Sequence, residues 1–499
     1  MKRYCLTVLI FVLLAAALSA CGGSDGTAPK GVAVEKNSAG KDDAGDGAAG
    51  DGAYEYRQFA GAPIDRYEPV DLGGRTINCN FYYTSSDPNS MHPSGPKPVI
   101  SDEGVLQSHI YIWENLKRVS EKYNIEFNFM GIPWGEHYEL FLTSVMSGDP
   151  AYDIFEMTYY YTLNCTQKGF VYSFDEFMPK DADAVNGQEY VVKGAPLMGK
   201  EYFFDFRQPY YDAPMLGVNL DIIEAIGAPN PVDLYNSGEW TWDAFLEICK
   251  LATRDIDGDG EIDQWGYGGP CQILSQCLIA TNSGSIIDTE TVTQRLDSPN
   301  TMEALQFMGD LYNVHKVAYS TPASTTTFDE DHDYNGNVRE FLNGTVCFFT
   351  HLAWHLPNGD ERLPYRFALV PHPKGPSSTD DYTYLAGIGG DCIPMGVKDP
   401  TVVYQIFEEM QYWWGDDYSI AEAGITDYAF QKYYDVEDWY RSRYNDENNG
   451  KVDLISITYL NEMSPVAVPI IRGEMTVSQA VEENKSSMEY KIRSGLFDE

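Results

Sequence analysis

Apolar side chains alternate between strand-like and helix-like spacing over residues 71–157, and this order limits the folds open to the chain. At positions 77, 79, 81 and 83 every second residue is apolar, which is typical of a half-buried strand. Apolar residues from Leu106 to Tyr123 then recur every three or four positions, which predicts a helix with one buried face. The series continues with two strands and an intervening helix, at residues 125–129, 152–157 and 138–145. Strands that alternate with helices predict right-handed βαβ units and a parallel sheet, so we expect an α/β fold.

Shorter elements of the same two kinds follow in the middle of the chain. We expect strands at three places, residues 215–218, 346–350 and 367–370. We expect helices at four places, residues 220–226, 242–252, 302–314 and 337–343. Thr241 is the predicted N-cap of the second of these helices, because its hydroxyl can accept a hydrogen bond from a free amide of the first turn.

The N-terminus has the pattern of an export signal. Lys2 and Arg3 precede an apolar run over residues 5–18, which is too short for the roughly 20 residues that a membrane-spanning helix needs. The sequence Leu18-Ser19-Ala20-Cys21 resembles the lipobox of bacterial lipoproteins. The resemblance implies removal of residues 1–20 and attachment of diacylglycerol and a further fatty acid such as palmitate to Cys21. The alternative is ordinary secretion, with a cysteine at this position by chance.

A tether is expected between the signal and the folded body. Residues 22–53 contain no aromatic residue and no Leu, Ile or Met, so they cannot bury enough apolar surface to offset the entropy of ordering. A GxGxxG pattern at residues 45–50 is not a dinucleotide site, because no strand precedes it and no apolar helix follows. We therefore predict a flexible linker over residues 21–70.

Charge and cysteine content exclude several classes of partner and structure. The formal net charge of −41 argues against a nucleic acid, which needs a basic face, and against an anionic lipid surface. Without Cys5 and Cys21, seven cysteines remain, and their irregular spacing does not predict a disulfide framework. We expect most of them to be small buried hydrophobes: Cys79, Cys165, Cys249, Cys271, Cys277, Cys347 and Cys392.

Three groups of residues carry a resemblance to a known family. The densest group contains GVNLD at 217–221, GEWTWDAF at 238–245 and DQWGY at 263–267. Further along, FLNGTV at 341–346 leads to Trp354, and VPHPKGP at 370–376 leads to Gly389-Gly390-Asp391. In this order the motifs resemble the extracellular solute-binding proteins of family 1, the sugar-binding class that serves ABC importers.

The resemblance implies a two-lobed, type II periplasmic-binding-protein-like fold. Its two parallel-rich sheets are flanked by helices, and the ligand lies in a cleft between the lobes that closes around a hinge. Lobe one is expected to span residues 71–207 and about 384–414, and lobe two residues 208–383 with about 415–499, including the C-terminal helices. The long segment 421–464 departs from shorter members of the family, so the resemblance does not define its topology.

The candidate ligand site combines aromatic and charged residues, because sugar rings pack on aromatic planes while charged groups bind hydroxyls. Tyr159 and Tyr160 follow a predicted strand, and Asp205, Arg207 and Tyr211 lie near the expected first crossover between lobes. By resemblance, Trp354 is a cleft tryptophan and Asp391 marks the later crossover. Packing in the core or at the rim is an equally valid interpretation of each. For Trp240, Trp242, Trp413 and Trp414, helical apolar patterns favour the core.

Residues 255–266 resemble an EF-hand-type calcium loop. Four carboxylates occupy the first, third, fifth and ninth positions and glycine the sixth, but Gly266 replaces the glutamate of the twelfth. We therefore predict a structural Ca²⁺ held by Asp255, Asp257, Asp259, Glu261 and Asp263. The alternative is an acidic turn closed by its own side-chain hydrogen bonds.

Together these features predict a monomeric receptor, lipid-anchored on the extracellular face of the membrane or in the periplasm. It is expected to capture a carbohydrate, in particular an oligosaccharide, and to deliver it to an ABC permease without catalysis. Three alternatives remain: a surface glycoside hydrolase or lyase, a receptor for peptides or another solute, and a sensor that presents its ligand to a membrane kinase.

Overall fold

The computed structural model describes most of the body of the chain. The described residues are 65–81, 107–131, 136–157, 161–177, 192–193, 200–205, 214–288, 291–319, 336–351, 363–379, 390–415 and 463–494. The predicted signal, Cys21 and most of the predicted linker lie outside them, as does the segment 421–462. No helix among the described residues is long and apolar enough to cross a membrane.

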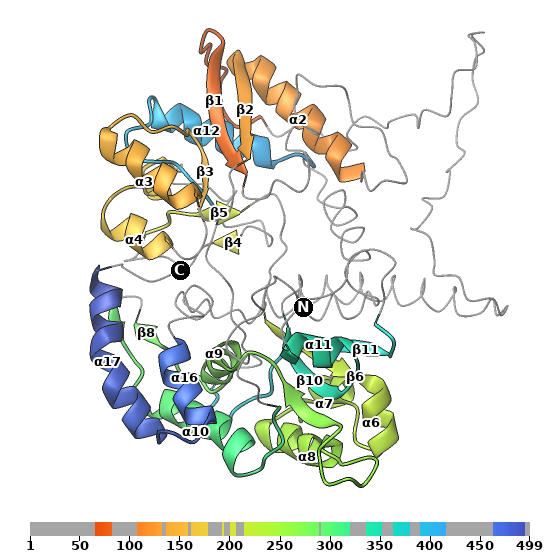
Figure 1. Ribbon diagram of the computed structural model, residues 1–499. Coiled ribbons are helices and arrows are strands. Elements are labelled where there is room, and N and C mark those ends of the chain that lie inside the picture. Colours follow the sequence, from red (N-terminus) through yellow and green to blue (C-terminus); the bar gives the residue numbers. More distant parts are fainter. Residues whose placement is uncertain are drawn as a thin grey trace, which may run out of the picture. The chain divides into compact units, whose positions relative to one another are not determined.

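The first sheet begins with the predicted βαβ unit. β1 (Arg75–Phe81) and β2 (Ile125–Gly131) pair in parallel along their whole length, and α2 (Gln107–Tyr123) connects them (Figure 1). β3 (Phe155–Met157) follows α3 (His137–Ser147), and a parallel bridge between Cys79 and Ile154 brings it beside β1. The expected strands and helices of residues 71–157 are therefore confirmed.

A four-stranded sheet in the order β3-β12-β5-β4 contains segments far apart in sequence. We call these four strands, together with β1 and β2, the first sheet, because the Cys79–Ile154 bridge joins the two parts. β12 (Gly390–Cys392) pairs antiparallel with both β3 and β5 (Phe204–Asp205), and β4 (Val192–Lys193) forms the edge. Three helical segments complete this part: α4 (Thr162–Gln167), the short η1 (Phe174–Glu176) and α12 (Pro400–Gln411).

The other four-stranded sheet, which we call the second sheet, has the order β11-β6-β10-β7. Its strands are β6 (Met215–Asn219), β7 (Trp265–Gly268), β10 (Val346–His351) and β11 (Phe367–Val370). The accompanying helices are α6 (Leu220–Ile226), α7 (Pro231–Ser237), α8 (Trp242–Ala252) and α11 (Gly336–Leu342). Thr241 Oγ1 accepts a hydrogen bond from the Ala244 amide at 3.4 Å, so the predicted cap of α8 is confirmed.

The strand directions in these sheets are mixed. β1 and β2 are parallel, and so are β10 and β7, as expected from alternating strands and helices. β6, however, is antiparallel to both of its neighbours, and β12 is antiparallel to β3 and β5. In sequence, each of these two strands comes directly after a strand of the other four-stranded sheet.

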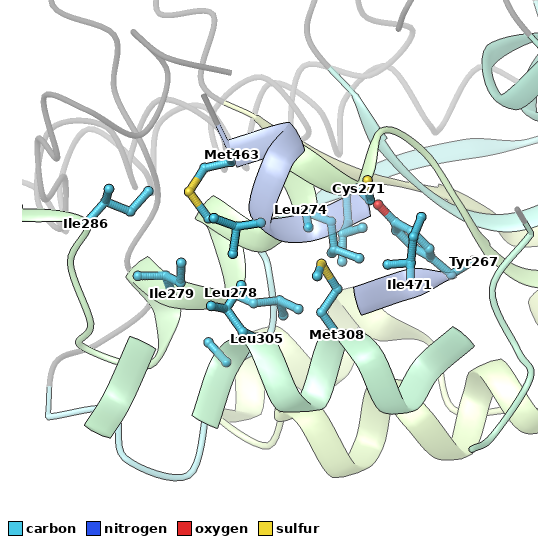
Figure 2. Packing of buried hydrophobic residues seen from close by; sticks show 14 of the residues in the cluster. Tyr267, Cys271, Leu274, Leu278, Ile279, Ile286, Leu305, Met308, Met463 and Ile471 are labelled. Atoms are coloured by element: carbon cyan, nitrogen blue, oxygen red, sulfur yellow. The ribbon is translucent and has the colours of Figure 1, made fainter. Parts of the chain in front are cut away.

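α9 (Cys271–Thr281) is buried on every side. α10 (Pro299–Asn313) and the C-terminal helix α16 (Ser464–Ile471) pack against it, and the last helix, α17 (Val477–Ser494), packs on α10 and α16. Figure 2 shows Met463 and Ile471 of the α16 region next to Leu274 and Leu278 of α9 and Met308 of α10. The hairpin of β8 (Ile287–Asp288) and β9 (Thr293–Gln294) lies against α17, where the Gln294 amide donates to Glu489 Oε2 at 2.7 Å. The last helices thus pack on elements about 200 residues earlier in the chain.

Buried apolar residues of the sheet that contains β6, β10 and β11 meet those of the segment after α12 in one cluster, which we call the junction cluster. It consists of Met215, Val338, Phe341, Phe349, Leu363, Phe367, Leu369, Tyr412, Trp413 and Trp414. Tyr412, Trp413 and Trp414 follow α12, whereas Met215, Phe349 and Leu369 belong to β6, β10 and β11. Since Trp240, Trp242, Trp413 and Trp414 are all buried, their assignment to the core is confirmed.

The seven cysteines of the described residues are buried and have free thiols, as predicted. Burial raises the pKa of Cys271 to about 12 and that of Cys277 well above its usual value. For Cys392 burial comes first, and the neighbouring Cys165 and Asp391 raise its pKa further. The thiols therefore behave as small apolar side chains.

Candidate functional site

Two of the seven predicted ligand-binding residues lie in the described part of the chain. Asp205 is the last residue of β5, and Asp391 is the middle residue of β12. The backbone of Asp391 pairs with Phe204, directly before Asp205, so the two predicted crossovers do bring these residues to adjacent strands. The other five are outside the described residues: Tyr159, Tyr160, Arg207, Tyr211 and Trp354.

Asp391 lies inside the sheet, with only 2% of its surface exposed. Its backbone also pairs with Glu156 of β3. A buried carboxylate needs compensating polar partners, so this position constrains the local structure strongly. Residues 371–389 join β11 of the second sheet to β12 of the first. Asp391 therefore lies where this connection reaches the first sheet.

The carboxyl ends of β1, β2 and β3 lie at one edge of the first sheet, the edge where α/β sheets bind ligands. Asn80, buried near the end of β1, joins two of these strands there. Its Oδ1 accepts from the Glu156 amide at 2.5 Å, and its Nδ2 donates to the Glu156 carbonyl at 3.3 Å. Asn80 was not among the predicted residues, because a polar residue at every second position is what the alternation of this strand itself contains.

An aromatic pair contains Tyr161, which follows the predicted Tyr159 and Tyr160 in the sequence. The ring of Tyr161 stacks on that of Tyr138 from α3, with ring centroids 3.7 Å apart and planes 1° from parallel. Tyr161 is buried and Tyr138 half-buried, and burial raises the pKa of Tyr138, so its hydroxyl stays protonated. This pair therefore stays neutral and packs on the same core cluster as Met157 of β3.

A buried chain of polar groups lies behind the corresponding edge of the second sheet. β7, β10 and β11 run in the same direction, so their carboxyl ends share that edge. The Tyr267 hydroxyl donates to Thr350 Oγ1 at 2.9 Å, and Thr350 Oγ1 lies 3.0 Å from His372 Nε2. All three residues are fully buried, and burial raises the pKa of Tyr267 well above its usual value. These hydrogen bonds link β7, β10 and His372, the second residue after β11. The ends of these three strands are expected to face the ligand.

The segment that leaves β11 is attached to the C-terminus of α9. The Gly375 amide donates to the Thr281 carbonyl at 3.0 Å, and the Ser377 amide donates to Asn282 Oδ1 at 2.9 Å. A Cβ atom on Gly375 would lie 2.2 Å from Asn282 Oδ1, so the approach requires glycine. Trp240 completes the attachment, because its Nε1 donates to the Pro371 carbonyl at 2.8 Å. The first part of this connection is thereby held rigidly on the second sheet's side.

The acidic loop is closed by hydrogen bonds from its own backbone. Asp255 Oδ1 and Oδ2 accept from the amides of Gly258 and Gly260, at 2.6 and 2.9 Å. Asp263 Oδ2 accepts from the Ile256 amide at 2.7 Å. Carboxylate oxygens of Asp255, Asp257 and Asp263 lie within 4.8 Å of one another, whereas Asp259 and Glu261 are outside this group. The geometry fits the first, third and ninth positions of a cation loop, and the carboxylates are exposed to solvent.

Solved structures of similar fold include proteins in complex with sugars, although their sequences differ widely from this one. An ABC substrate-binding protein from Listeria monocytogenes in complex with cycloalternan has a TM-score of 0.55 and 15% identity, over 84% of this chain and 99% of its own. A maltose/maltodextrin-binding domain from Bdellovibrio bacteriovorus bound to maltotriose has a TM-score of 0.53 and 16% identity, over 84% and 100%. A cyclo/maltodextrin-binding protein complexed with maltotetraose has a TM-score of 0.54 and 13% identity, over 84% and 98%. The predicted fold class is therefore confirmed.

Sequence comparison defines the family. No curated protein matches the chain in sequence. Residues 111–388, more than half of the chain, match the sequence profile described as bacterial extracellular solute-binding protein. The chain belongs to this family of bacterial extracellular solute-binding proteins.

Proposed function

We propose that the protein is a receptor that captures an oligosaccharide by closure of two lobes and delivers it to the permease of an ABC importer. The observation that carries the proposal is the fold, which it shares with proteins solved with cycloalternan, maltotriose and maltotetraose. Family membership supports an extracellular or periplasmic binding role. The neutral aromatic pair of Tyr138 and Tyr161 suits the apolar face of a sugar ring.

The expected ligand site combines this pair with the predicted residues. In the proposal, Tyr159, Tyr160, Tyr211 and Trp354 pack on sugar rings, while Asp205, Arg207 and Asp391 bind hydroxyls. A ligand bound between the lobes stabilises the closed form by the difference between its binding free energies to the closed and the open form. The permease recognises the closed form. Such a receptor needs no covalent chemistry.

A glycan that binds is expected to raise the thermal stability of the full-length protein. At a hundredfold excess over its dissociation constant, a ligand adds about 2.7 kcal/mol to the free energy of unfolding. We would screen malto-oligosaccharides, β-linked oligosaccharides and peptides by thermal unfolding. Trp354→Ala is expected to weaken the best glycan about tenfold or more, and Trp354→Phe less, because it keeps an aromatic ring.

Two outcomes decide against the receptor proposal, and a third decides only against the place of Trp354 in the site. Stabilisation by a peptide with no response to any glycan would show a different solute class. Release of shorter sugars from the bound glycan would favour the hydrolase or lyase. Equal affinity of wild type and Trp354→Ala would remove Trp354 from the site, while leaving the receptor role intact.

We also propose that the acidic loop holds a structural Ca²⁺. Asp255, Asp257 and Asp263 would supply carboxylate oxygens, and the amides that already order these carboxylates reduce the cost of bringing like charges together.

Adding CaCl₂ to chelator-treated protein is expected to raise the unfolding temperature by mass action, and MgCl₂ to raise it less. Asp255→Asn is expected to remove the response. Glu483→Gln, an exposed change of the same charge on α17, should keep it. An unchanged unfolding temperature on adding calcium would favour the self-closed acidic turn.

We further propose that Cys21 carries the lipid that holds the receptor at the membrane. The proposal rests on Leu18-Ser19-Ala20-Cys21 behind a charged start and an apolar run. Several acyl chains on one residue give stable anchoring, whereas a single chain gives only marginal binding. The expected linker then lets the body reach the permease.

A further inference from the structure

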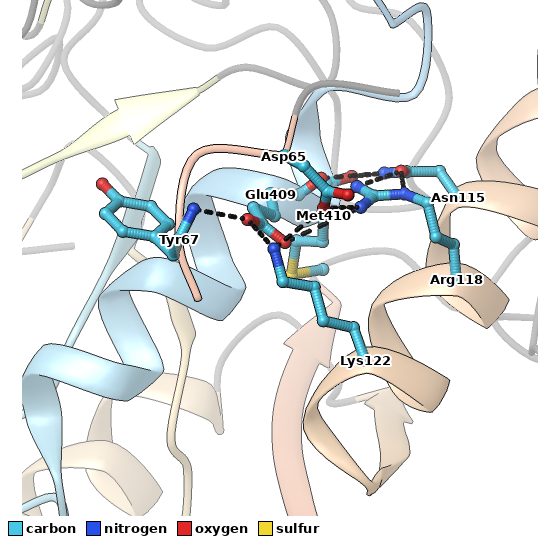
Figure 3. Close-up of polar contacts among 7 residues, drawn as sticks. All are labelled: Asp65, Tyr67, Asn115, Arg118, Lys122, Glu409 and Met410. Carbon is cyan, nitrogen blue, oxygen red and sulfur yellow. Dashed lines mark hydrogen bonds and ion pairs between the residues drawn. The ribbon is translucent and has the colours of Figure 1, made fainter. Parts of the chain in front are cut away.

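The residues directly before β1 are bound to the surface of the first sheet's helices. We call residues 65–72 the strap. Asp65 Oδ1 accepts from Lys122 Nζ at 2.8 Å and from Arg118 Nη1 at 3.0 Å, both on α2. At the other end of the strap the Leu72 amide donates to the Tyr123 carbonyl at 3.0 Å. Figure 3 shows Asp65 and Tyr67 beside side chains of both α2 and α12. Residues 65–70, which the sequence placed in the flexible linker, thus pack on the folded body, and the strap adjoins the expected tether.

The strap covers two carboxylates that are almost completely buried. Glu408 and Glu409 of α12 are 1% and 0% exposed. Glu409 pairs with Lys122 at 2.7 Å and lies 3.8 Å from Arg118, so α2 supplies its cations. Glu408 pairs with Arg66 and accepts a hydrogen bond from the Tyr67 hydroxyl. Within the described residues, Arg66 is the one cation paired with Glu408. Because an unpaired buried charge is very costly, Glu408 depends on the strap.

Glu408 lies one helical turn before the junction cluster. The Tyr412 hydroxyl is 3.5 Å from Glu408 Oε1, and both side chains are buried. Trp414 packs edge-on against Tyr412 and Trp413, with ring centroids 5.9 and 5.3 Å away. These three aromatics pack with residues of β6, β10 and β11, while Ile112 of α2 packs against the same cluster. A continuous set of contacts therefore runs from Arg66 through Glu408 and Tyr412 to the second sheet.

We propose that the strap is a latch that sets the stiffness of the joint between the two sheets. With Arg66 and Tyr67 on Glu408, the last turn of α12 is held in place, and Tyr412, Trp413 and Trp414 keep their packing against the second sheet. When the strap is released, Glu408 loses its cation and the last turn of α12 loosens. The consequence for lobe closure rests on the proposed receptor function, because the strap joins the expected tether to the joint on which closure depends.

Hydrogen exchange of the full-length protein, measured without ligand, tests the latch. In Arg66→Met, peptides that contain Tyr412–Trp414 and peptides from β11 are expected to exchange about tenfold faster, since local opening becomes easier. Peptides from β7 should be unchanged. Arg295→Met is the matched control, because Arg295 forms an exposed ion pair with Asp288 at 3.6 Å, away from α12.

Two further variants make the test specific. Tyr67→Phe removes one hydrogen bond from Glu408 without changing charge, and it should accelerate the same peptides less than Arg66→Met does. Adding Glu408→Gln to Arg66→Met removes the buried charge and should return exchange in β11 towards the wild-type rate. If Arg66→Met accelerates only the strap and α12 while β11 keeps its wild-type rate, the latch is excluded. Failure of the Glu408→Gln rescue excludes its electrostatic cause. If no glycan in the thermal screen binds, the receptor proposal is overturned. The latch proposal is unaffected by that result, because hydrogen exchange is measured without ligand.

Discussion

Replacing Cys21 by serine is expected to abolish the incorporation of labelled palmitate into the protein in growing cells. In the proposed lipoprotein, diacylglycerol would be attached through a thioether, which serine cannot form. Each acyl CH₂ buried in the membrane contributes about 0.8 kcal/mol to the free energy of membrane binding. The loss of several acyl chains therefore removes a very large part of that free energy. The measurement is autoradiography or click detection of the purified protein.

Cys5→Ser is the matched control, because Cys5 lies in the segment that is expected to be removed. It should leave palmitate labelling at the wild-type level. A second comparison replaces residues 1–21 by an ordinary cleavable signal; that protein is expected in the soluble fraction, while the wild type sediments with membranes. Wild-type protein that lacks palmitate and is soluble would favour ordinary secretion.

Trp240→Ala is expected to lower the free energy of unfolding by about 3–5 kcal/mol, the usual cost of removing a large buried side chain. Trp240 is fully buried. Its ring centroid lies 6.1 Å from that of Phe245 and 5.7 Å from that of Phe348. Its indole also donates to the Pro371 carbonyl, at the start of the connection to the first sheet. The variant therefore removes both packing in the second sheet and one attachment of that connection. Denaturant unfolding of the full-length protein measures the effect.

Trp240→Phe separates the two contributions. It keeps an aromatic ring but leaves the buried Pro371 carbonyl without its donor, which costs about 1–3 kcal/mol. Equal losses in the two variants would show that the hydrogen bond dominates and that packing contributes little. A loss below about 1 kcal/mol in Trp240→Ala would contradict the close packing of this site.

Local patterns predicted the regular elements well where one face is buried. The alternation at 77–83 and 125–129 and the apolar stripe of α2 became β1, β2 and their connecting helix. α9 gave no such signal, because a helix buried on every side has no polar face to create periodicity. β4 and β5 have two residues each, too few to show any period.

The site was predictable only to the level of sheet edges and crossovers. Proximity of Asp205 and Asp391 followed from the resemblance, and their strands do pair through Phe204. By contrast, the partnership of Arg66 with Glu408 joins residues 342 apart. No local pattern contains that information, and both residues resemble ordinary surface charges. His372 belongs to the VPHPKGP motif at 370–376, but only the structure shows its hydrogen-bonded contact with Thr350.

The burial of all seven described cysteines has a practical consequence for measuring lobe movement. A thiol reacts as its thiolate, and a raised pKa keeps that form scarce at neutral pH. Maleimide dyes should therefore ignore the native thiols of the folded body. Two cysteines introduced at exposed positions, one on α3 and one on α7, could carry a donor and an acceptor without a cysteine-free background. The protein is in effect already prepared for distance measurements between its sheets while ligand binds.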